Sequence, residues 1–481
     1  MRGGGRRARF TVLALLSLLG AVTSPLPSAA HGVLRRSEPA AGARLSAAPR
    51  ALRLIFNEPT ELAVARLELV GPGGVAVALS PVRHGDTPVV LVADVVGRLE
   101  AGTHTVRWQV AGRDGHPVRG RFAFTILANA SGLGPAPSDA TDPGDGATAA
   151  DSGVTVAPPP ARDSTTPTSV VAFDAQSPLF AAVRWLGFVA TLALIGAAGL
   201  AFVVLPTAER RGGVPAAVVR VAAGRARALG QLAAGALLAA GALRLAAQSA
   251  AMNADAAGDG TSLASIVGET LWGRAWAIQA VAAPLALAGF LLLARRPAGA
   301  RVIVLLSVVA TCVGASLSGH AAAASSLAIA VPVDATHVLL AGGWLGTLLA
   351  LVVAGVQSVG EAPETERAGT AALLVNAFSP LALLCAAGVA LTGAISAWLN
   401  LGSLSALASS EYGRTLAVKL AAVSLVALTG AYNWRRVRPA LMREEGRRRL
   451  SRSATLELIV GAIVLAVTAV LVATPPPGAP P

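Results

Sequence analysis

The pattern of hydrophobic and polar residues changes twice along this chain of 481 residues. Between residues 31 and 127 the apolar residues come in short runs, and some alternate with polar residues, as in the stretch THTVRWQVAG. From about residue 180 onward the apolar runs are long enough to cross a bilayer, which takes about 20 residues. Residues 128–177, between these regions, contain almost nothing that a core would bury. The pattern predicts two structured regions joined by a linker.

Five segments of the first region are typical of β-strands: ALRLIFNE, ARLELVG, PVVLVADV, THTVRWQVAG and GRFAFTIL. They are short, rich in β-branched and aromatic residues, and separated by Gly, Pro, Asn and Asp. Short strands at regular spacing over about 100 residues predict an all-β sandwich or barrel. Trp108 is the expected anchor of its core.

The second region predicts an all-α bundle of about eight transmembrane helices across residues 178–475. The expected spans lie near residues 180–206, 228–250, 274–294, 301–319, 334–356, 371–398, 414–434 and 455–474. Residues 128–177 are rich in Ala, Gly, Pro, Ser, Thr and Asp, which predicts a flexible, disordered linker. Residues 476–481 form a proline-rich tail.

Composition excludes an ordinary soluble protein, because 54% of the residues are hydrophobic and only 14% are charged. The net charge of +13 does not indicate a nucleic-acid partner, since most arginines lie in short loops between apolar runs. Alternate loops carry roughly seventeen lysine and arginine residues against about two, a bias that places the basic loops in the cytoplasm. The expected partner is therefore the lipid bilayer, with residues 31–127 outside the cell. Cys312 and Cys385 lie in apolar runs and form no disulfide framework.

The first thirty residues support the same orientation. Residues 1–30 combine an arginine-rich start, an apolar core near residues 10–22 and the ending Ser28-Ala29-Ala30, which together predict a secretory signal peptide. Cleavage after Ala30 would make His31 the first residue of the mature protein. We therefore expect a multi-pass protein of the plasma membrane with an extracytoplasmic N-terminal domain.

An N-terminal histidine is a good chelator, because its α-amine and imidazole can bind one metal ion together. Asp114 and His116 are two residues apart, so in an extended chain they point to the same side. Glu58 lies at the predicted end of a strand. Nitrogen and carboxylate ligands in a roughly square-planar array suit Cu(II). The alternative is that His116 is a surface histidine beside a turn.

His31, the segment FNEP and the segment DGHP, in this order and spacing, resemble the periplasmic copper-binding family CopC. The resemblance covers residues 31–127 and implies a small Greek-key sandwich or barrel of cupredoxin-like or immunoglobulin-like shape. It implies Cu(II) ligands at His31, Asp114 and His116, with Glu58 near the site. Some members carry a methionine-rich Cu(I) loop, whereas this chain has only three methionines. We therefore expect the external domain to hold Cu(II) alone.

Two histidines remain in the apolar half, His320 and His337, near the expected outer ends of adjacent spans. Ionisable groups at membrane depth are costly and mark functional sites, so both are candidate metal ligands; solvation at the headgroups is the alternative. Asp334 shares a helix face with His337. Lys419 lies within a span and is expected to face the bundle interior or extend to the interface. We expect Trp272, Trp398 and Tyr412 to be anchors at the membrane interface rather than substrate contacts.

The segments SGHA, DATHVLLAGGWLGTLL and EYGRTLAVKLAAVSLVALTGAYNWRR resemble the copper-resistance membrane family CopD, over residues 178–474. A copper-binding domain fused to a polytopic domain implies that the protein captures Cu(II) outside the cell and delivers it to a membrane transport domain. The implied roles are copper import, homeostasis and resistance. We expect no enzyme, and the sequence identifies no protein partner. The alternative is a haem-binding redox protein resembling a cupric reductase, which would show a Soret band. A passive anchor would not need about eight spans.

Overall fold

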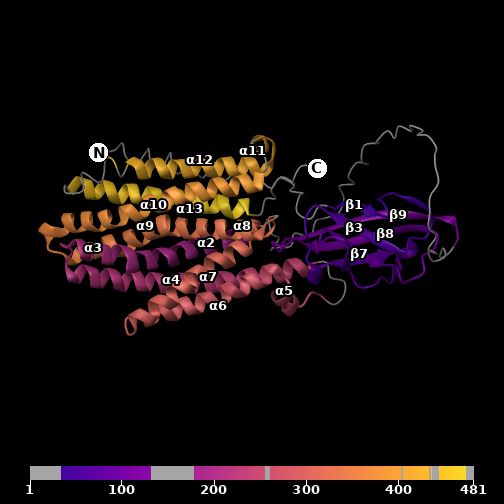
Figure 1. Ribbon diagram of the computed structural model, residues 1–481, viewed down its shortest axis with the longest axis horizontal. Helices are drawn as coiled ribbons and strands as arrows, with labels where there is room; N and C mark the ends of the chain where they lie inside the picture. The colour runs from indigo at the N-terminus through magenta and orange to yellow at the C-terminus, as the bar shows by residue number, and fades with distance from the viewer. Residues whose placement is uncertain are drawn as a thin grey trace.

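The computed structural model describes residues 34–131, 178–254, 260–324, 326–401, 405–432, 435 and 444–472. Figure 1 shows a β-rich body at one end of a long helical bundle. The predicted signal peptide, residue His31, most of the predicted linker and the proline-rich tail lie outside the described residues. The expected combination of an all-β domain and an all-α bundle is confirmed.

The β domain is a sandwich rather than a closed barrel, because its described strands form two separate sheets. One sheet has the order β1-β3-β7-β6, and the other has the order β2-β9-β8-β4-β5. All neighbours are antiparallel except β2 and β9, which are parallel. The strands are β1 (Leu34–Glu38), β2 (Arg44–Ala47), β3 (Ala51–Phe56), β4 (Arg66–Val70), β5 (Ala76–Val77), β6 (Arg83–His84), β7 (Val90–Asp94), β8 (Gly102–Ala111) and β9 (Pro117–Ser131).

Alternation along the strands builds the core between the sheets. In β3 every second residue is buried, and its inward side chains meet those of β8. Trp108 is the expected anchor: its ring packs edge-on against Phe56, with the ring centroids 5.2 Å apart. His104 is also fully buried, and its ring stacks on Phe124. β9 continues to Ser131, four residues beyond the domain boundary expected from sequence.

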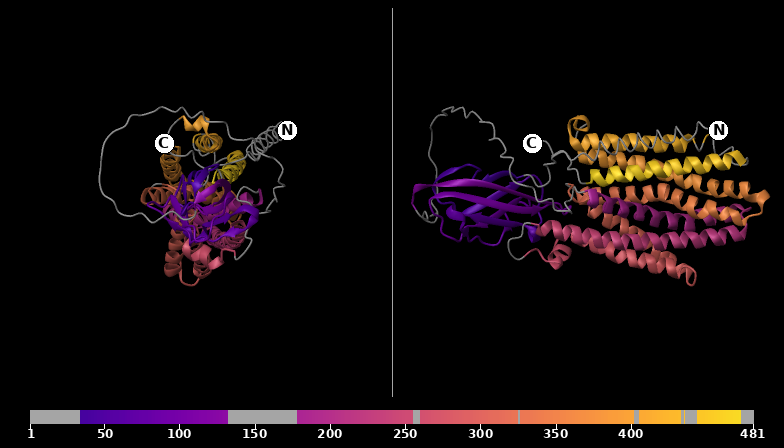
Figure 2. Two further views of the ribbon diagram at one scale, coloured as in Figure 1. Left: turned by 90° about the vertical axis from the view of Figure 1, so that its right-hand side faces the viewer. Right: turned by 180° about the vertical axis from the view of Figure 1, so that it is seen from behind.

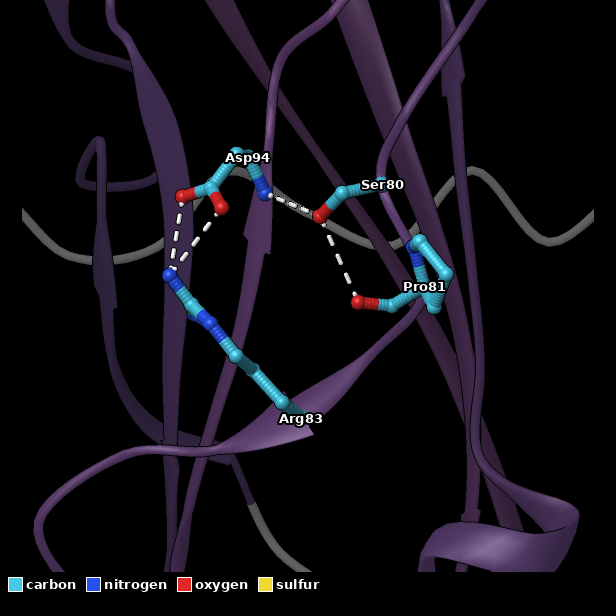
Figure 3. A network of polar contacts seen from close by, with 4 residues as sticks. All are labelled: Ser80, Pro81, Arg83 and Asp94. Carbon is cyan, nitrogen blue, oxygen red and sulfur yellow. Dashed lines mark hydrogen bonds and ion pairs between the residues drawn. The ribbon is translucent and has the colours of Figure 1, made fainter.

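The edge of the smaller sheet is held by a polar network at the surface (Figure 3). Arg83 of β6 donates from one Nη to both carboxylate oxygens of Asp94 at 3.0 Å, and the Asp94 N–H donates to Ser80 Oγ at 2.9 Å. Because Arg83 and Asp94 are about half exposed, this pair contributes little to stability. The ion pair links the two-residue strand β6 to the neighbouring strand β7.

Among the described residues, eight helical stretches are long and apolar enough to cross a membrane, as expected. Figures 1 and 2 show them side by side, alternating in direction, with their long axes pointing at the β domain. The helices are α2 (Pro178–Gly199), α3 (Leu205–Arg211), α4 (Ala216–Asn253), α5 (Leu263–Glu269), α6 (Leu271–Leu292), α7 (Pro297–Leu317), α8 (Leu327–Ala341), α9 (Thr347–Ala350), α10 (Arg367–Leu401), α11 (Ala406–Ser409), α12 (Glu411–Tyr432) and α13 (Glu444–Leu471).

Two of the spans extend through π-helical turns. The π-turn η3 (Leu200–Val204) joins α2 to α3. The span that begins with α8 continues through η5 (Gly342–Gly346), α9 and η6 (Leu351–Val356), of which η5 and η6 are π-turns. π-Turns inside α-helices are frequently found at functional sites.

The span containing His337 begins earlier than its sequence indicated. We expected it to start near residue 334, which would place His337 at its end. In the structure α8 begins at Leu327, so His337 is ten residues inside the helix, roughly 15 Å from its start. Pro332 and Asp334 resemble a helix boundary, but the apolar residues before them extend the helix. The Asp334 carboxylate accepts a hydrogen bond from Ser316 of α7.

The β domain is docked on the bundle through the ends of α4, α5 and α6. Val64 and Ala111 of the β domain form an apolar cluster with Met252, Ile266 and Trp272 of these helices. Polar contacts surround this cluster. They join Arg66 to Thr261 Oγ1, Gln109 to the Met252 carbonyl, Arg119 to the Ala251 carbonyl and the Leu271 N–H to Glu61. The two bodies therefore meet through an apolar centre with a polar rim.

Candidate copper site and its contacts

The predicted ligands Asp114 and His116 lie on the turn between β8 and β9, at the end of the sandwich that faces the helices. The turn is closed by two backbone hydrogen bonds, from Gly115 N to Gly112 O at 2.9 Å and from Gly112 N to His116 O at 3.3 Å. Gly115 has φ of 84°, a left-handed conformation that glycine adopts without steric cost. Pro117 then starts β9. The sequence GRDGHP is therefore a rigid turn that fixes both side chains.

Asp114 holds His116 in one orientation. The Asp114 side chain is only 1% exposed; its Oδ2 lies 2.8 Å from His116 Nδ1, and its Oδ1 accepts from the His116 backbone N–H at 3.1 Å. Because a carboxylate can only accept, Nδ1 carries the proton, and the lone pair that can bind a metal is on Nε2. The His116 side chain is 17% exposed. Asp114 thus orients the imidazole in the way that carboxylates behind metal-binding histidines do.

Glu58 belongs to the same small space. A Cβ added to Gly112 would lie 3.0 Å from Asp114 Oδ1 and 3.1 Å from Glu58 Oε1. Both carboxylates therefore lie beside Gly112, where another residue would carry its side chain. The bridge between Thr60 and Gly112 brings the segment after β3 against the turn. The structure therefore brings together Glu58, Asp114 and His116 as the sequence predicts.

This group fits copper only with a further ligand. Among the described residues, no group of three or more His, Cys, Asp or Glu side chains is arranged to hold a metal ion. His31, which we predict as that further ligand, lies outside the described residues. The described chain begins at Leu34, which pairs with Phe56 at the end of β3 nearest Glu58. Nitrogen and oxygen donors at this end of the sheet suit Cu(II) better than Cu(I).

Sequence reasoning did not single out Glu61, which lies three residues beyond Glu58. Its carboxylate accepts a hydrogen bond from the Leu271 N–H at the start of α6, at 3.2 Å. Burial raises the pKa of Glu61 above its ordinary value, and the bond from Leu271 opposes that rise in part. An acidic residue in a loop gives no sign in sequence that a membrane helix will cover it.

The turn between the two predicted ligands touches the helical bundle directly. Gln248 of α4 donates through Nε2 to the Gly115 carbonyl at 2.5 Å, and a Cβ on Gly115 would lie 2.6 Å from Cγ of Trp272. Trp272 is 4% exposed, so our expectation that it anchors the chain at the lipid interface is wrong for this residue. Trp398, by contrast, is 62% exposed. Tyr412 is buried at 5% and does not face outward.

From Trp272 the contacts continue toward α7. The Arg244 guanidinium lies 5.9 Å from the Trp272 ring centroid and donates to Ser318 Oγ at 3.3 Å. Gln279 reaches the same hydroxyl at 3.4 Å. Ser318 ends α7, and His320 begins the next short turn, η4 (His320–Ala322). A continuous row of contacts thus joins the turn of the β domain to the segment that carries His320.

The two predicted membrane ligands lie at different depths. The backbone of His320 is at the end of the bundle, whereas His337 is inside α8. His337 Nδ1 is 2.9 Å from Thr392 Oγ1 of α10, and Asp334 Oδ2 accepts from Ser316 Oγ of α7 at 2.7 Å. Lys419 of α12 interacts electrostatically with both Asp334 and His337. The hydrogen bonds of His337 and Asp334 therefore join α8 to α10 and to α7.

The cysteines lie in the apolar packing of the bundle. Cys312 is 2% exposed and Cys385 is 5% exposed, and neither forms a disulfide. They pack in two different apolar clusters. This placement suits small packing residues.

Comparison with known proteins agrees with the architecture. The CopC domain family matches residues 34–127. The N-terminal domain family of Copper resistance protein D-like proteins matches residues 174–330. The family Copper resistance protein D matches residues 372–471. Protein YobA of Escherichia coli strain K12 is 32% identical over 98 residues, which are 20% of this chain and 79% of that protein.

Copper transport protein CutJ of Bacillus subtilis strain 168 is 24% identical over 489 residues, covering 99% of this chain and 79% of that protein. The crystal structure of PcoC, a methionine-rich copper resistance protein from Escherichia coli, covers 20% of this chain and 99% of its own, with 31% identity and a TM-score of 0.19. This chain is a multi-pass membrane protein that joins a CopC domain to a CopD domain, and it belongs to the CopC/CopD copper-resistance family.

Proposed function

We propose that this protein captures Cu(II) outside the cell on its CopC domain and delivers it to the CopD domain for import. The observation that carries the proposal is the contact of the Asp114–His116 turn with Gln248 and Trp272 at the end of the membrane bundle. A captured ion would need to travel only the width of this interface. The row through Arg244 and Ser318 then leads to the segment of His320.

The copper ligands in this proposal are His31 and Nε2 of His116, with Glu58 beside them, and Asp114 orients the His116 ring through Nδ1. His31 is three residue steps before Leu34, a reach of about 10 Å in an extended chain. This reach starts at Leu34, which lies at the end of the sheet where Glu58 and the turn also lie. His31 can complete the site only if its amine is free, which signal cleavage after Ala30 would provide.

The orientation also belongs to the proposal. Arginine-rich segments such as the end of α3 lie at the end of the bundle remote from the β domain (Figure 1). The positive-inside rule places that end in the cytoplasm and the β domain outside.

Copper uptake by cells expressing the full chain tests the proposal. We expect uptake at limiting external Cu(II), and we expect His116→Ala to reduce it strongly there and weakly at saturating copper. Asp94→Ala, an exposed carboxylate of the same domain, is the matched control and should leave uptake unchanged. Uptake equal in cells with and without the protein would refute the proposed import. A Soret band in the purified protein would instead favour the haem-binding alternative.

A further inference from the structure

The β domain covers the last turn of α4, where a helix leaves carbonyl groups without partners. The last four carbonyls of an α-helix have no N–H donor within the helix, and Ala251 and Met252 are among the last four residues of α4. A docked domain removes water from such carbonyls, so it must supply donors of its own. The surface that covers this end of α4 should therefore be rich in donors.

The donors come from one row of side chains across three neighbouring strands. Arg66 of β4 pairs with Gln109 of β8, and Gln109 pairs with Arg119 of β9. Directly opposed residues of neighbouring strands project to the same face of a sheet, so the three side chains stand side by side. We call Arg66, Gln109 and Arg119 the helix-end row. It combines two guanidinium groups with one amide.

Arg119 and Gln109 cap two successive carbonyls of α4. Arg119 donates through Nη2 to the Ala251 carbonyl at 2.5 Å, and Gln109 Nε2 donates to the Met252 carbonyl at 3.0 Å. Arg119 Nε also donates to Gln109 Oε1 at 2.8 Å, which turns the amide so that its N–H group faces the helix. A guanidinium group suits the negative end of the helix dipole. The two residues therefore act as one unit, in which Arg119 orients Gln109.

Arg66 extends the helix-end row to the chain that follows α4. It donates to Thr261 Oγ1 at 2.8 Å. The Thr261 N–H donates to Asn253 Oδ1 at 2.6 Å, and Asn253 Nδ2 donates to the Thr261 carbonyl at 3.1 Å. Since Asn253 is the last residue of α4, Thr261 is fastened to the helix end. The row thus holds both the end of α4 and the segment that leads to α5.

The same helix holds the copper-binding turn at a second point. Gln248 lies about one helical turn before the capped carbonyls and donates to the Gly115 carbonyl at 2.5 Å. On the hairpin of β8 and β9, Gln109 and Arg119 stand two residue pairs from the last pair before the turn. The hairpin therefore meets α4 at its tip and along its strands. Two points of attachment fix the angle between the hairpin and the helix.

We propose that the helix-end row is a recognition surface for the C-terminal end of α4, and that Arg119 is a positioning residue for copper delivery. Arg119 acts through Gln109 and the hairpin, because capping α4 keeps the copper-binding turn against Gln248 and Trp272. Arg119 lies on β9 and not in the turn with the predicted ligands, so we expect copper affinity to be independent of it. This inference rests on the proposed function and names the residue that aligns the capture site with the bundle.

Copper uptake by cells expressing the full chain, measured over a range of external Cu(II), tests the role of Arg119. Arg119→Gln removes the charge and the planar group that holds Gln109 and the helix end together. We expect a lower maximal rate of uptake and an unchanged half-saturating copper concentration. His116→Ala should behave differently, because it removes a predicted ligand and acts most strongly at limiting copper.

Hydrogen exchange of the purified full chain gives a second readout that does not need transport. In Arg119→Gln the amides of residues 248–253 should exchange about tenfold faster, the change expected when one charge-assisted hydrogen bond is lost. The electron paramagnetic resonance spectrum of bound Cu(II) should be the same as in the unaltered protein, because the ligands are not changed.

Arg121→Gln is the matched control, since Arg121 is an exposed arginine two residues further along β9 on the same face of the sheet. It should change neither uptake nor exchange. Arg119→Lys keeps a cation that can cap one carbonyl but lacks the planar fork, so it should recover part of the maximal rate. Gln109→Ala should resemble Arg119→Gln, and the double variant should be little worse than either, because the two residues act as a unit.

The outcomes separate the two proposals. No copper uptake by the unaltered protein would refute the proposed function, while unchanged exchange at residues 248–253 in Arg119→Gln would overturn the recognition surface whether or not uptake occurs. Uptake by the unaltered protein with an unchanged maximal rate in Arg119→Gln would overturn only the positioning role. A raised half-saturating concentration in Arg119→Gln, or equal losses in Arg119→Gln and Arg121→Gln, would also overturn it, because the effect would then lie in copper binding or in surface charge.

Discussion

The protein places an aspartate beside a histidine twice, and the two pairs behave differently. On the turn of the CopC domain, Asp114 binds His116 directly, with Oδ2 2.8 Å from Nδ1. On helix α8, Asp334 and His337 face the same side but bind different hydroxyl groups, Ser316 and Thr392. In the first pair the carboxylate is hydrogen-bonded to the histidine itself, whereas in the second each residue is hydrogen-bonded to a neighbouring helix.

In the proposed function the two pairs would serve two stages of one task. A carboxylate that fixes an imidazole prepares one nitrogen for strong binding, which suits capture of a scarce ion. On α8 the carboxylate and the imidazole are held by the separate hydroxyl groups of Ser316 and Thr392, and not by each other. The contact between the turn and Trp272 connects the first pair to the helical bundle, so the predictions below start with that contact.

Trp272→Ala should have the largest effect, because it removes the ring that fills the space between the two domains. Truncating a buried tryptophan costs about 3–5 kcal/mol, and here part of that loss falls on docking. We expect faster hydrogen exchange at residues 112–116 and at the end of α4, and slower copper delivery with unchanged copper affinity of the CopC domain. This outcome would separate the two Asp–His pairs functionally.

The control for this change is Trp398→Ala, whose ring is 62% exposed. A surface substitution of this kind changes stability by less than about 0.5 kcal/mol and should leave exchange at the turn unchanged. Equal protection of residues 112–116 in Trp272→Ala and in the unaltered protein would show that the docked arrangement does not depend on Trp272.

Asp114→Asn should have the next largest effect and sharpens the comparison between the pairs. The change keeps the shape of the side chain but weakens its hold on His116, so Cu(II) affinity should fall about 10- to 100-fold. A titration of the full chain followed by electron paramagnetic resonance measures it. Asp94→Asn is the matched control, and Asp334→Asn should leave this external affinity unchanged. If Asp94→Asn and Asp114→Asn weaken binding equally, the turn is not the site.

The smallest effect concerns pH and Glu61. Burial raises the pKa of Glu61 in the docked protein, so the docked state holds a proton more tightly than a state in which Glu61 faces water. Docking should therefore strengthen as the pH falls through the raised pKa, with the gain complete below the ordinary value of 4.5. Hydrogen exchange of the start of α6 at several pH values measures this, and we expect a change of only a few-fold.

Glu61→Gln imitates the protonated carboxyl group and keeps an acceptor for the Leu271 N–H. Docking in this variant should be independent of pH over the same range. A pH dependence that survives the substitution would assign the effect to another group.

The fold was largely predictable, because the sequence patterns that build it are local. The segments containing β3, β4, β7, β8 and β9 alternate or carry β-branched residues, and the apolar runs have the length that a bilayer requires. The turn with Asp114 and His116 was also predictable, since glycine and proline flank the ligands. The start of α8 was not, because Pro332 and Asp334 resemble a boundary and only contact with α7 shows that the helix continues.

The docking of the two domains could not be predicted from sequence. Gln248, Met252 and Trp272 are ordinary residues for the end of a membrane helix, and nothing in their spacing indicates that a soluble domain covers them. Long-range contacts of this kind depend on the shapes of both surfaces. The hydrogen bond between His337 and Thr392 has the same origin, since their positions differ by 55 along the chain.

Gly115 lies where two independent constraints meet, and this has a consequence for genetics. An alanine there must adopt a left-handed backbone conformation, and its methyl group must also displace the ring of Trp272. A second-site change that shrinks Trp272 relieves the collision but not the backbone strain, so it suppresses the defect only in part. In a selection for growth on scarce copper, partial suppressors of Gly115→Ala should therefore map to the face of α6 and not to the ligand residues.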